Sequence, residues 1–458
     1  MYYHNFVNKP NLLLIVVDSL RSDQVSKSNI YPNLKSLLTN STHFETCISS
    51  AASTILGMGT MLTGQFPFKI GLGDKNFRRL NPEIPTFTHF LKQLGYDLHA
   101  TVPKIANEFG LTCNFSDDKK DYENYYSLFA GLGDEIIKKL EIQDNKKPWF
   151  FYMHIFDLHS PVIVPPQFND LKFGISQYER MVYAIDDWLG KIIKKINFDD
   201  TLLILTSDHG EYIPISNTKN GIINLEPSFT EKTLWRFGNK IPDDLKPLKL
   251  KLGSTFRKTR NKIKSMKMDN EFLTTYQKRI LLNSRMEEGH RMFDDLLKTP
   301  LIICGKGIPK NKKISNIIRQ VDIFPTIFDL IGFQYDNKKI DGKSLKFLFS
   351  ENIETNIDCY IESPPSRQID SKKFIGIRNN EYKLIESLDR DISHRELYDL
   401  KNDPFEENNI SENNLELVNS LEKKLEKIRG NFSNNDEENT DFSEKEKINE
   451  ILKKLGYQ

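Results

Sequence analysis

The feature that most constrains the fold of this chain is a set of short, almost wholly apolar runs spread along its length. In chain order they cover residues 12–17, 149–154, 201–206 and 300–304. Their length and their branched and aromatic side chains are typical of strands buried on both faces of a parallel sheet. Stretches with helical spacing, residues 32–38, 84–94 and 178–195, lie between them. Strands that alternate with helices predict an α/β fold, with a mostly parallel sheet covered on both faces.

Side chains able to bind a ligand follow three of these runs. Asp18 follows the first run, His159 follows the second, and Asp208 and His209 follow the third. The carboxyl ends of parallel strands meet at one edge of a sheet, where ligands bind in open α/β folds. Asp18, Asp208 and His209 therefore predict a divalent metal site, although an Asp-His pair alone also fits a helix cap beside a surface histidine. Asp208 and His209 are adjacent in the sequence, and adjacent residues on a strand point to opposite faces, so both can reach one ion only from a loop. Gly210 permits the turn that such a loop needs.

A stretch of small hydroxyl residues is the candidate nucleophile segment. Residues 50–54 contain three hydroxyl side chains and precede an apolar stretch with helical character. Ser53 or Thr54 would then cap a helix, whose N-terminus favours anions through its free N–H groups and its dipole. A nearby divalent ion could lower the pKa of such a hydroxyl and make it a nucleophile. Simple capping is the alternative when these residues are considered without the metal ligands.

Composition excludes several other classes. Among 458 residues, 64 basic and 63 acidic side chains nearly cancel, so no nucleic-acid or membrane partner is expected from overall charge. The cysteines are dispersed and form no CxxC pair, which argues against a structural zinc site and a disulfide framework. The start of the chain lacks the pattern of a signal peptide, and no apolar run is long enough to span a bilayer. We therefore expect a soluble, cytoplasmic protein without a transmembrane segment.

The chain divides into three expected units. Residues 1–348 form a large catalytic domain with an insert at 212–288, and residues 349–430 form a small C-terminal α+β unit. Residues 431–458 contain an acidic linker and a short helix at 443–455. Within the insert, residues 246–267 carry many basic side chains and no acidic ones. A solvated lid is favoured there over a binding element for an anionic partner.

Short motifs along nearly the whole chain occur in the order of one known family. They lie at residues 11–23, 62–64, 95–96, 157–161, 207–211, 289–290, 299–303, 322–326, 341–345 and 396–404. On these motifs the chain resembles the sulfatase family of the alkaline phosphatase superfamily. The resemblance implies a metal-dependent hydrolase with an alkaline phosphatase-like three-layer sandwich and a small C-terminal antiparallel sheet.

The same resemblance assigns roles by position. Thr54 lies ten residues before the Gly of Leu62-Thr63-Gly64, where the family keeps its nucleophile. The implied metal shell consists of Asp18, Thr54, Asp208 and His209, and the implied contacts to the transferring group are His159 and His290. Ser19 stands where sulfatases usually hold a second Asp, which leaves the number of ligands open. His154 and Lys104 lie near substrate positions of the family, but their local sequence matches poorly and neither is included.

Thr54 also bears on the reaction. Sulfatases hold Cys or Ser at this position, in a Cys/Ser-x-Pro-Ser-Arg motif, and convert it to formylglycine. Thr54 is followed by Ile-Leu-Gly-Met58 instead, and oxidation of a threonine would give a ketone rather than the aldehyde. Family branches with an unmodified threonine resemble phosphotransferases and hydrolases of phosphate or phosphonate esters. Residues 363–367 spell the sulfatase motif, but they follow a predicted strand at 358–362 without a later Leu-Thr-Gly, and we interpret them as a turn.

We therefore expect a hydrolase of phosphate or phosphonate esters that forms a covalent intermediate on Thr54. The alternatives are a phosphotransferase that modifies a glycan or lipid headgroup, a sulfate-ester hydrolase, and an inactive homologue that binds an anion. One divalent ion is expected, and the imidazole of His209 favours manganese or zinc over calcium or magnesium. A second ion is left open. The expected partner is a small, glycan-linked or lipid-linked anionic ester, and the oligomeric state is not predicted.

Overall fold

A computed structural model describes most of the chain. The described residues are 9–72, 79–115, 127–142, 147–228, 268, 272–282, 290–334, 339–351, 353–364, 373–388 and 394–430. Three features from the sequence lie outside them: the basic run at 246–267, the helix expected at 443–455, and most of the sulfatase-like motif at 363–367.

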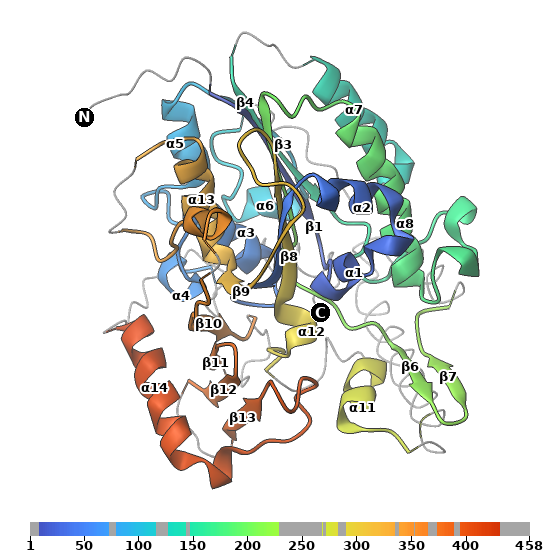
Figure 1. Cartoon of the computed structure of the whole chain (residues 1–458), viewed down its shortest axis with the longest axis vertical. Coiled ribbons are helices and arrows are strands. Elements are labelled where there is room, and N and C mark those ends of the chain that lie inside the picture. Colours follow the sequence, from blue (N-terminus) through green and yellow to red (C-terminus); the bar gives the residue numbers. More distant parts are fainter. Residues whose placement is uncertain are drawn as a thin grey trace, which may run out of the picture.

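The centre of the molecule is a seven-stranded sheet with the order β3-β4-β1-β5-β8-β2-β9 (Figure 1). Its strands are β1 (Asn11–Val17), β2 (Thr42–Ile48), β3 (Asp97–Thr101), β4 (Trp149–Ile155), β5 (Thr201–Thr206), β8 (Lys298–Cys304) and β9 (Lys312–Arg319). Strand β1 pairs in parallel with β4 and β5, and β3 pairs in parallel with β4. The predicted α/β fold with a mostly parallel sheet is confirmed. Strand β8 is antiparallel to both neighbours, so its carboxyl end lies at the opposite edge from that of β5.

Helices cover both faces of the sheet (Figure 1). One face carries α2 (Pro32–Thr39), α7 (Leu132–Ile142) and α8 (Gln177–Ile193). The other carries α3 (Thr54–Thr63), α5 (Phe87–Gln93), α6 (Lys104–Glu108) and α13 (Ile323–Leu330). Side chains alternate along a strand, so Leu13 and Ile15 pack under the first set while Leu12 and Leu14 pack under the second. This explains why the strand is apolar at every position.

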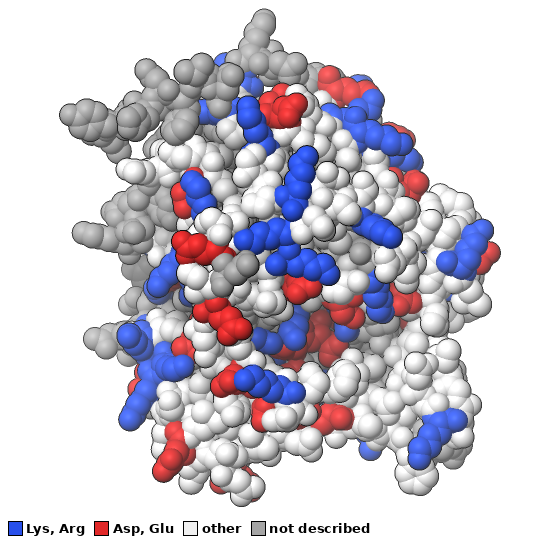
Figure 2. Space-filling view, in the orientation of Figure 1, with Lys and Arg blue, Asp and Glu red and all other residues white. Residues whose placement is uncertain are grey.

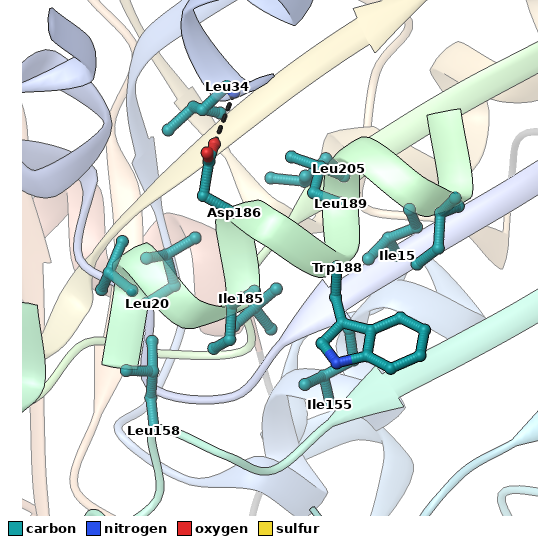
Figure 3. Close-up of a pocket in the computed structure, with 13 residues that line it drawn as sticks. Ile15, Leu20, Leu34, Ile155, Leu158, Ile185, Asp186, Trp188, Leu189 and Leu205 are labelled. Atoms are coloured by element: carbon teal, nitrogen blue, oxygen red, sulfur yellow. Dashed lines mark hydrogen bonds between the residues drawn. The ribbon is translucent and has the colours of Figure 1, made fainter. Parts of the chain in front are cut away.

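A carboxylate in the first layer joins α2 to α8. Asp186 on α8 accepts hydrogen bonds from the backbone N–H groups of Asn33 and Leu34, at 3.1 and 2.6 Å, and so caps the first turn of α2 (Figure 3). The cavity beside Asp186 in Figure 3 is lined otherwise by apolar side chains, among them Trp188 and Ile15. It lies beneath α8, on the face of the sheet opposite α3, and it offers no groups for chemistry.

The C-terminal unit is a four-stranded antiparallel sheet. It contains β10 (Cys359–Glu362), β11 (Phe374–Arg378), β12 (Tyr382–Ser387) and β13 (Glu396–Asp399), packed against α14 (Leu415–Arg429). The predicted C-terminal antiparallel sheet is confirmed. Its first strand contacts the segment before Thr54, because Glu362 N donates a hydrogen bond of 2.8 Å to Ser50 O. The ring of Tyr360 also packs on Phe66 and Phe68, with centroids 5.3 and 4.8 Å apart.

The remaining described elements are short. They are α1 (Ser22–Ser26), α4 (Pro67–Ile70), the hairpin of β6 (Ile215–Thr218) and β7 (Gly221–Asn224), α11 (Thr275–Leu282) and α12 (Asp294–Leu297), together with several 3-10 turns. None of the helices in the described part of the chain combines the length and the apolar character needed to cross a bilayer. Acidic and basic side chains are interspersed over the face shown in Figure 2.

A buried group of charges ties the C-terminal sheet to the main domain. Lys383 on β12 is fully buried and forms ion pairs with Asp294 on α12 and with Glu406. Its ammonium also donates a hydrogen bond to Met292 O at 3.0 Å. Arg378 on β11 pairs with Asp294 at 2.9 Å. Because charges removed from water are costly unless they are paired, each member of this group depends on the others.

We predict that Lys383→Met strongly destabilises the protein, because the substitution leaves Glu406 buried without its cation. Breaking a buried ion pair in this way costs about 3–5 kcal/mol, so the melting temperature should fall by several degrees. Lys401→Met is the matched control, since Lys401 pairs with Glu381 at the surface and should change the melting temperature little. Equal melting temperatures for the two variants would contradict the structural role of Lys383.

Candidate active site

The predicted ligands meet at the carboxyl edge of the central sheet. Asp18 follows β1, while Asp208 and His209 follow β5, and the carboxyl end of β4 lies beside that of β1. Both aspartates are completely buried, and His209 is only 3% exposed. The three residues therefore lie together, because parallel neighbouring strands bring their carboxyl ends to one place.

Each aspartate uses one oxygen to hold the loops and turns the other oxygen inward. Asp208 Oδ1 accepts hydrogen bonds from the backbone N–H groups of Ser19 at 3.1 Å and His209 at 2.8 Å. Asp18 Oδ1 accepts a hydrogen bond of 2.7 Å from Ser19 Oγ. The inward oxygen of Asp208, Oδ2, has no hydrogen-bond partner among the residues that the structure describes. A buried carboxylate oxygen without a hydrogen-bond partner raises the free energy of the folded protein unless a cation binds it.

Thr54 is the first residue of α3 and points at this pair of carboxylates. Its Oγ1 donates a hydrogen bond of 3.0 Å to Asp18 Oδ2 and lies 3.5 Å from His209 Nε2. Ser53 occupies the N-cap position, as one of the two predicted alternatives required. Gly57, one turn into the helix, lies so near the Asp208 backbone that a Cβ atom there would be 2.9 Å from Asp208 O. A side chain at residue 57 would therefore push the first turn of α3, which carries Thr54, away from Asp208.

His209 is oriented to offer a lone pair to the site. Its Nδ1 lies 2.7 Å from Gly210 O, and because a carbonyl can only accept, this nitrogen carries the proton. In the neutral ring, Nε2 is then the basic nitrogen, and it faces Thr54. Gly210 allows the loop to approach α12, because a Cβ atom there would be 2.1 Å from Asp295 O. Close packing, rather than a left-handed turn, is thus the reason for glycine at this position.

His154, which the sequence analysis set aside, belongs to the same constellation. It lies near the end of β4, is 1% exposed, and places Nε2 3.7 Å from Asp18 Oδ2 and 3.6 Å from Asp208 Oδ2. Tyr152 lies 3.0 Å from its other ring nitrogen. Burial alone would lower the pKa of His154, but the two carboxylates raise it to about 9. A polar residue in an otherwise apolar buried strand was the signal that could have identified it.

The donor set fits a divalent cation. One ligand atom each from Asp18, His154 and Asp208 lie within 4.8 Å of one another. Contacts of 3.6–3.7 Å between Nε2 and the carboxylate oxygens are too long for good hydrogen bonds. They suit ligands that share one ion at about 2.0–2.2 Å from each. Buried carboxylate and imidazole donors together are the chemistry that transition metals prefer.

The loop after β1 has an unusual backbone conformation. Ser19 has φ 63°, in the left-handed region that a non-glycine residue seldom occupies. Three contacts hold it there: its hydroxyl on Asp18, its N–H on Asp208, and its carbonyl, which accepts a hydrogen bond of 2.6 Å from Tyr178 Oη. Ser19 thus positions the two carboxylates and supplies no carboxylate of its own.

Gln320 is a further positioning residue that the sequence did not indicate. Its buried side-chain amide donates to both Ser207 O and Asp208 O, at 2.9 Å each. Its Oε1 accepts a hydrogen bond of 3.2 Å from Ser49, which precedes the segment that carries Thr54. One amide therefore connects the loop of Asp208 and His209 to the segment that precedes Thr54. No sequence pattern distinguishes this glutamine from others.

The two predicted substrate histidines have different surroundings. His159 is buried and stacks on Phe156, with ring centroids 5.4 Å apart. Burial raises the pKa of the Asp18 carboxyl, but a contact with His154 and the charges of His159 and His209 hold this pKa well below its usual range. His290 instead accepts a hydrogen bond of 3.0 Å from Met292 N and bonds Glu396 through Nε2 at 2.9 Å. Both ring nitrogens of His290 are thus engaged in this conformation.

Comparisons with known proteins agree with this arrangement. The Sulfatase family model matches residues 10–333, and the model for the C-terminal part of N-sulphoglucosamine sulphohydrolase matches residues 286–431. Arylsulfatase K of Bos taurus is 23% identical over 92% of this chain and 81% of its own length.

Two solved structures share the fold. BT4656, solved in complex with its substrate D-glucosamine-2-N,6-O-disulfate, has a TM-score of 0.62 and 18% identity, over 94% of this chain and 99% of its own. The phosphonate monoester hydrolase of Agrobacterium radiobacter has a TM-score of 0.63 and 17% identity, over 92% of this chain and 95% of its own. Because the Sulfatase model spans most of the chain, this protein belongs to the sulfatase family of the alkaline phosphatase superfamily and is a sulfatase-family hydrolase.

Proposed function

We propose that this protein hydrolyses the ester of a tetrahedral, anionic acid with Thr54 as its nucleophile. The position of Thr54 Oγ1, between Asp18 Oδ2 at 3.0 Å and His209 Nε2 at 3.5 Å, is the observation that carries the proposal. A hydroxyl that donates a hydrogen bond to a carboxylate can pass its proton to that carboxylate as its oxygen attacks. A divalent ion held by Asp18, Asp208 and His209, with Thr54 beside it, would lower the pKa of the hydroxyl and offset charge on the substrate.

The covalent step follows from this geometry. Thr54 Oγ1 attacks the sulfur or phosphorus in line with the ester oxygen, forms a Thr54 ester, and expels the alcohol. His159 is the proposed proton donor to the leaving oxygen, because it is buried and follows the carboxyl end of β4, next to that of β1. His290 can share that task only after it releases Glu396. Water then attacks the Thr54 ester and restores the hydroxyl; an acceptor alcohol in place of water would make the enzyme a transferase.

A sulfate ester on a sugar is the first proposed substrate class. Arylsulfatase K and BT4656, whose substrate is a glucosamine disulfate, both support it. These relatives favour sulfate esters over the phosphate and phosphonate esters that were expected from the sequence. The substrate is therefore expected to bring a negatively charged group to a site that is lined by His154, His159 and His209.

A phosphate or phosphonate ester is the second candidate, and Thr54 itself favours it. A threonine cannot become formylglycine, so the intermediate can be resolved only by a second attack at sulfur or phosphorus. Phosphoryl esters of hydroxyl side chains are established intermediates of this kind of two-step catalysis. The phosphonate monoester hydrolase among the structural relatives supports this candidate.

We predict that Thr54→Ala lowers turnover at least about 1,000-fold on every active substrate, whereas Thr54→Ser retains measurable turnover because it keeps the hydroxyl. The assay compares matched sulfate, phosphate and phosphonate monoesters after metal loading. Mass spectrometry of quenched reactions should detect a sulfuryl or phosphoryl adduct on the peptide that contains Thr54. Undiminished turnover by Thr54→Ala would eliminate the proposed nucleophile, and the adduct identifies the transferred group.

We predict that Gly57→Ala lowers turnover roughly 100-fold, because the new methyl group displaces Thr54 from Asp208 by a fraction of an ångström or more. Gly59→Ala is the matched control in the same helix. Its Cβ atom would lie nearest to the side-chain ends of Leu72 and Ile70, at 2.5 and 2.8 Å, and these ends can move. Steady-state rates and metal content are measured for both variants, and similar rates would show that the contact with Asp208 is unimportant.

A further inference from the structure

We propose that His154 is a metal ligand of this site and that Tyr152 is the residue that orients it. The centre would then hold its ion with two carboxylates and two imidazoles, from Asp18, Asp208, His154 and His209, next to Thr54. This inference rests on the metal site of the proposed function, but not on the reaction or on the substrate.

The first argument is the position of Ser19. The resemblance places a second carboxylate at this residue, but the hydroxyl that replaces it is engaged with Asp18 Oδ1 at 2.7 Å. The left-handed backbone at Ser19 also directs its N–H toward Asp208. Ser19 therefore leaves the ion one protein ligand short, and a neighbouring element has to supply it.

The second argument is the register of β1 and β4. These strands are parallel, and His154 is paired with Val16, two residues before Asp18. Residues two apart on a strand lie on the same face, so Asp18 and His154 share one face of the sheet at its carboxyl edge. Their side chains approach there, and His154 Nε2 lies almost equally far from Asp18 Oδ2 and Asp208 Oδ2, at 3.7 and 3.6 Å.

The third argument is the contact that orients the ring. Tyr152, also on β4, places its hydroxyl 3.0 Å from His154 Nδ1, and both side chains are buried. When Nδ1 donates a proton to the phenol oxygen, Nε2 is left with its lone pair directed between the two carboxylates. Partners of this kind fix the tautomer of a ligating histidine, and their loss typically costs 10–100-fold in metal affinity.

Metal preference follows from the donor set. Calcium and magnesium take oxygen ligands, whereas imidazole suits zinc and other transition ions. Two imidazoles therefore make this centre selective for zinc, manganese or cobalt, more strongly than His209 alone would. Calcium at millimolar concentration should not displace cobalt from the protein.

The test is proton NMR of the Co(II)-substituted full chain in water. Each coordinated imidazole gives one strongly shifted, solvent-exchangeable N–H signal. The wild type should show two such signals, from His154 and His209, and His154→Gln should show one. His89→Gln, at an exposed histidine on α5, should keep both signals. Zinc titrations should show that Tyr152→Phe binds zinc 10–100-fold more weakly than the wild type. This second variant tests the assignment even if His154→Gln does not fold.

The outcomes separate this inference from the proposed function. Two signals in the wild type and one in His154→Gln support the assignment even if no ester is hydrolysed, which would refute only the proposed reaction. A single signal in the wild type, or two in folded His154→Gln, overturns the assignment even if Thr54-dependent hydrolysis is observed. An unchanged zinc Kd for Tyr152→Phe overturns the orienting role. Failure of the wild type to bind zinc or cobalt overturns both proposals.

Discussion

The site depends on the close approach of the first turn of α3 to the backbone at Asp208. Gly57 makes that approach possible, because any side chain at this position would meet Asp208 O. Thr54, three residues earlier on the same helix, consequently reaches Asp18 Oδ2 and His209 Nε2. Gln320 fixes the same juxtaposition from the other side through the carbonyls of residues 207 and 208. Thr54 and the polar groups around it are thus held in place largely by packing and by hydrogen bonds to the backbone.

Two carboxylates completely removed from water give the site its chemical character. Each satisfies one oxygen with loop hydrogen bonds and directs the other toward the same small volume. An uncompensated buried charge is very costly, so the volume between Asp18 and Asp208 attracts positive charge. The pKa of His154 is raised for this reason, because the two carboxylates favour the protonated, positively charged imidazole. A divalent ion bound there would supply two positive charges and would contact the same side chains.

The C-terminal unit contributes to the site by support rather than by chemistry. Strand β10 pairs briefly with the segment before Thr54 through Glu362 and Ser50. Lys383 anchors the segment of residues 292–294, which follows His290, and Glu396 on β13 binds His290 itself. Two sheets far apart in the sequence therefore share the task of placing the loops around Thr54.

The sequence by itself determined the layered α/β architecture and the meeting of Asp18, Asp208 and His209 at one edge of the sheet. Apolar runs that end in Asp18, Asp208 and His209 were sufficient, because parallel strands bring their carboxyl ends together whatever the loops do. Tertiary structure decided the antiparallel direction of β8, the close packing of Gly57 and the contacts of Gln320, since each depends on residues more than 90 positions away. It also decided the place of His154. In the sequence this histidine is one polar residue in an apolar strand. Only the register of β4 against β1 brings it close to the two aspartates.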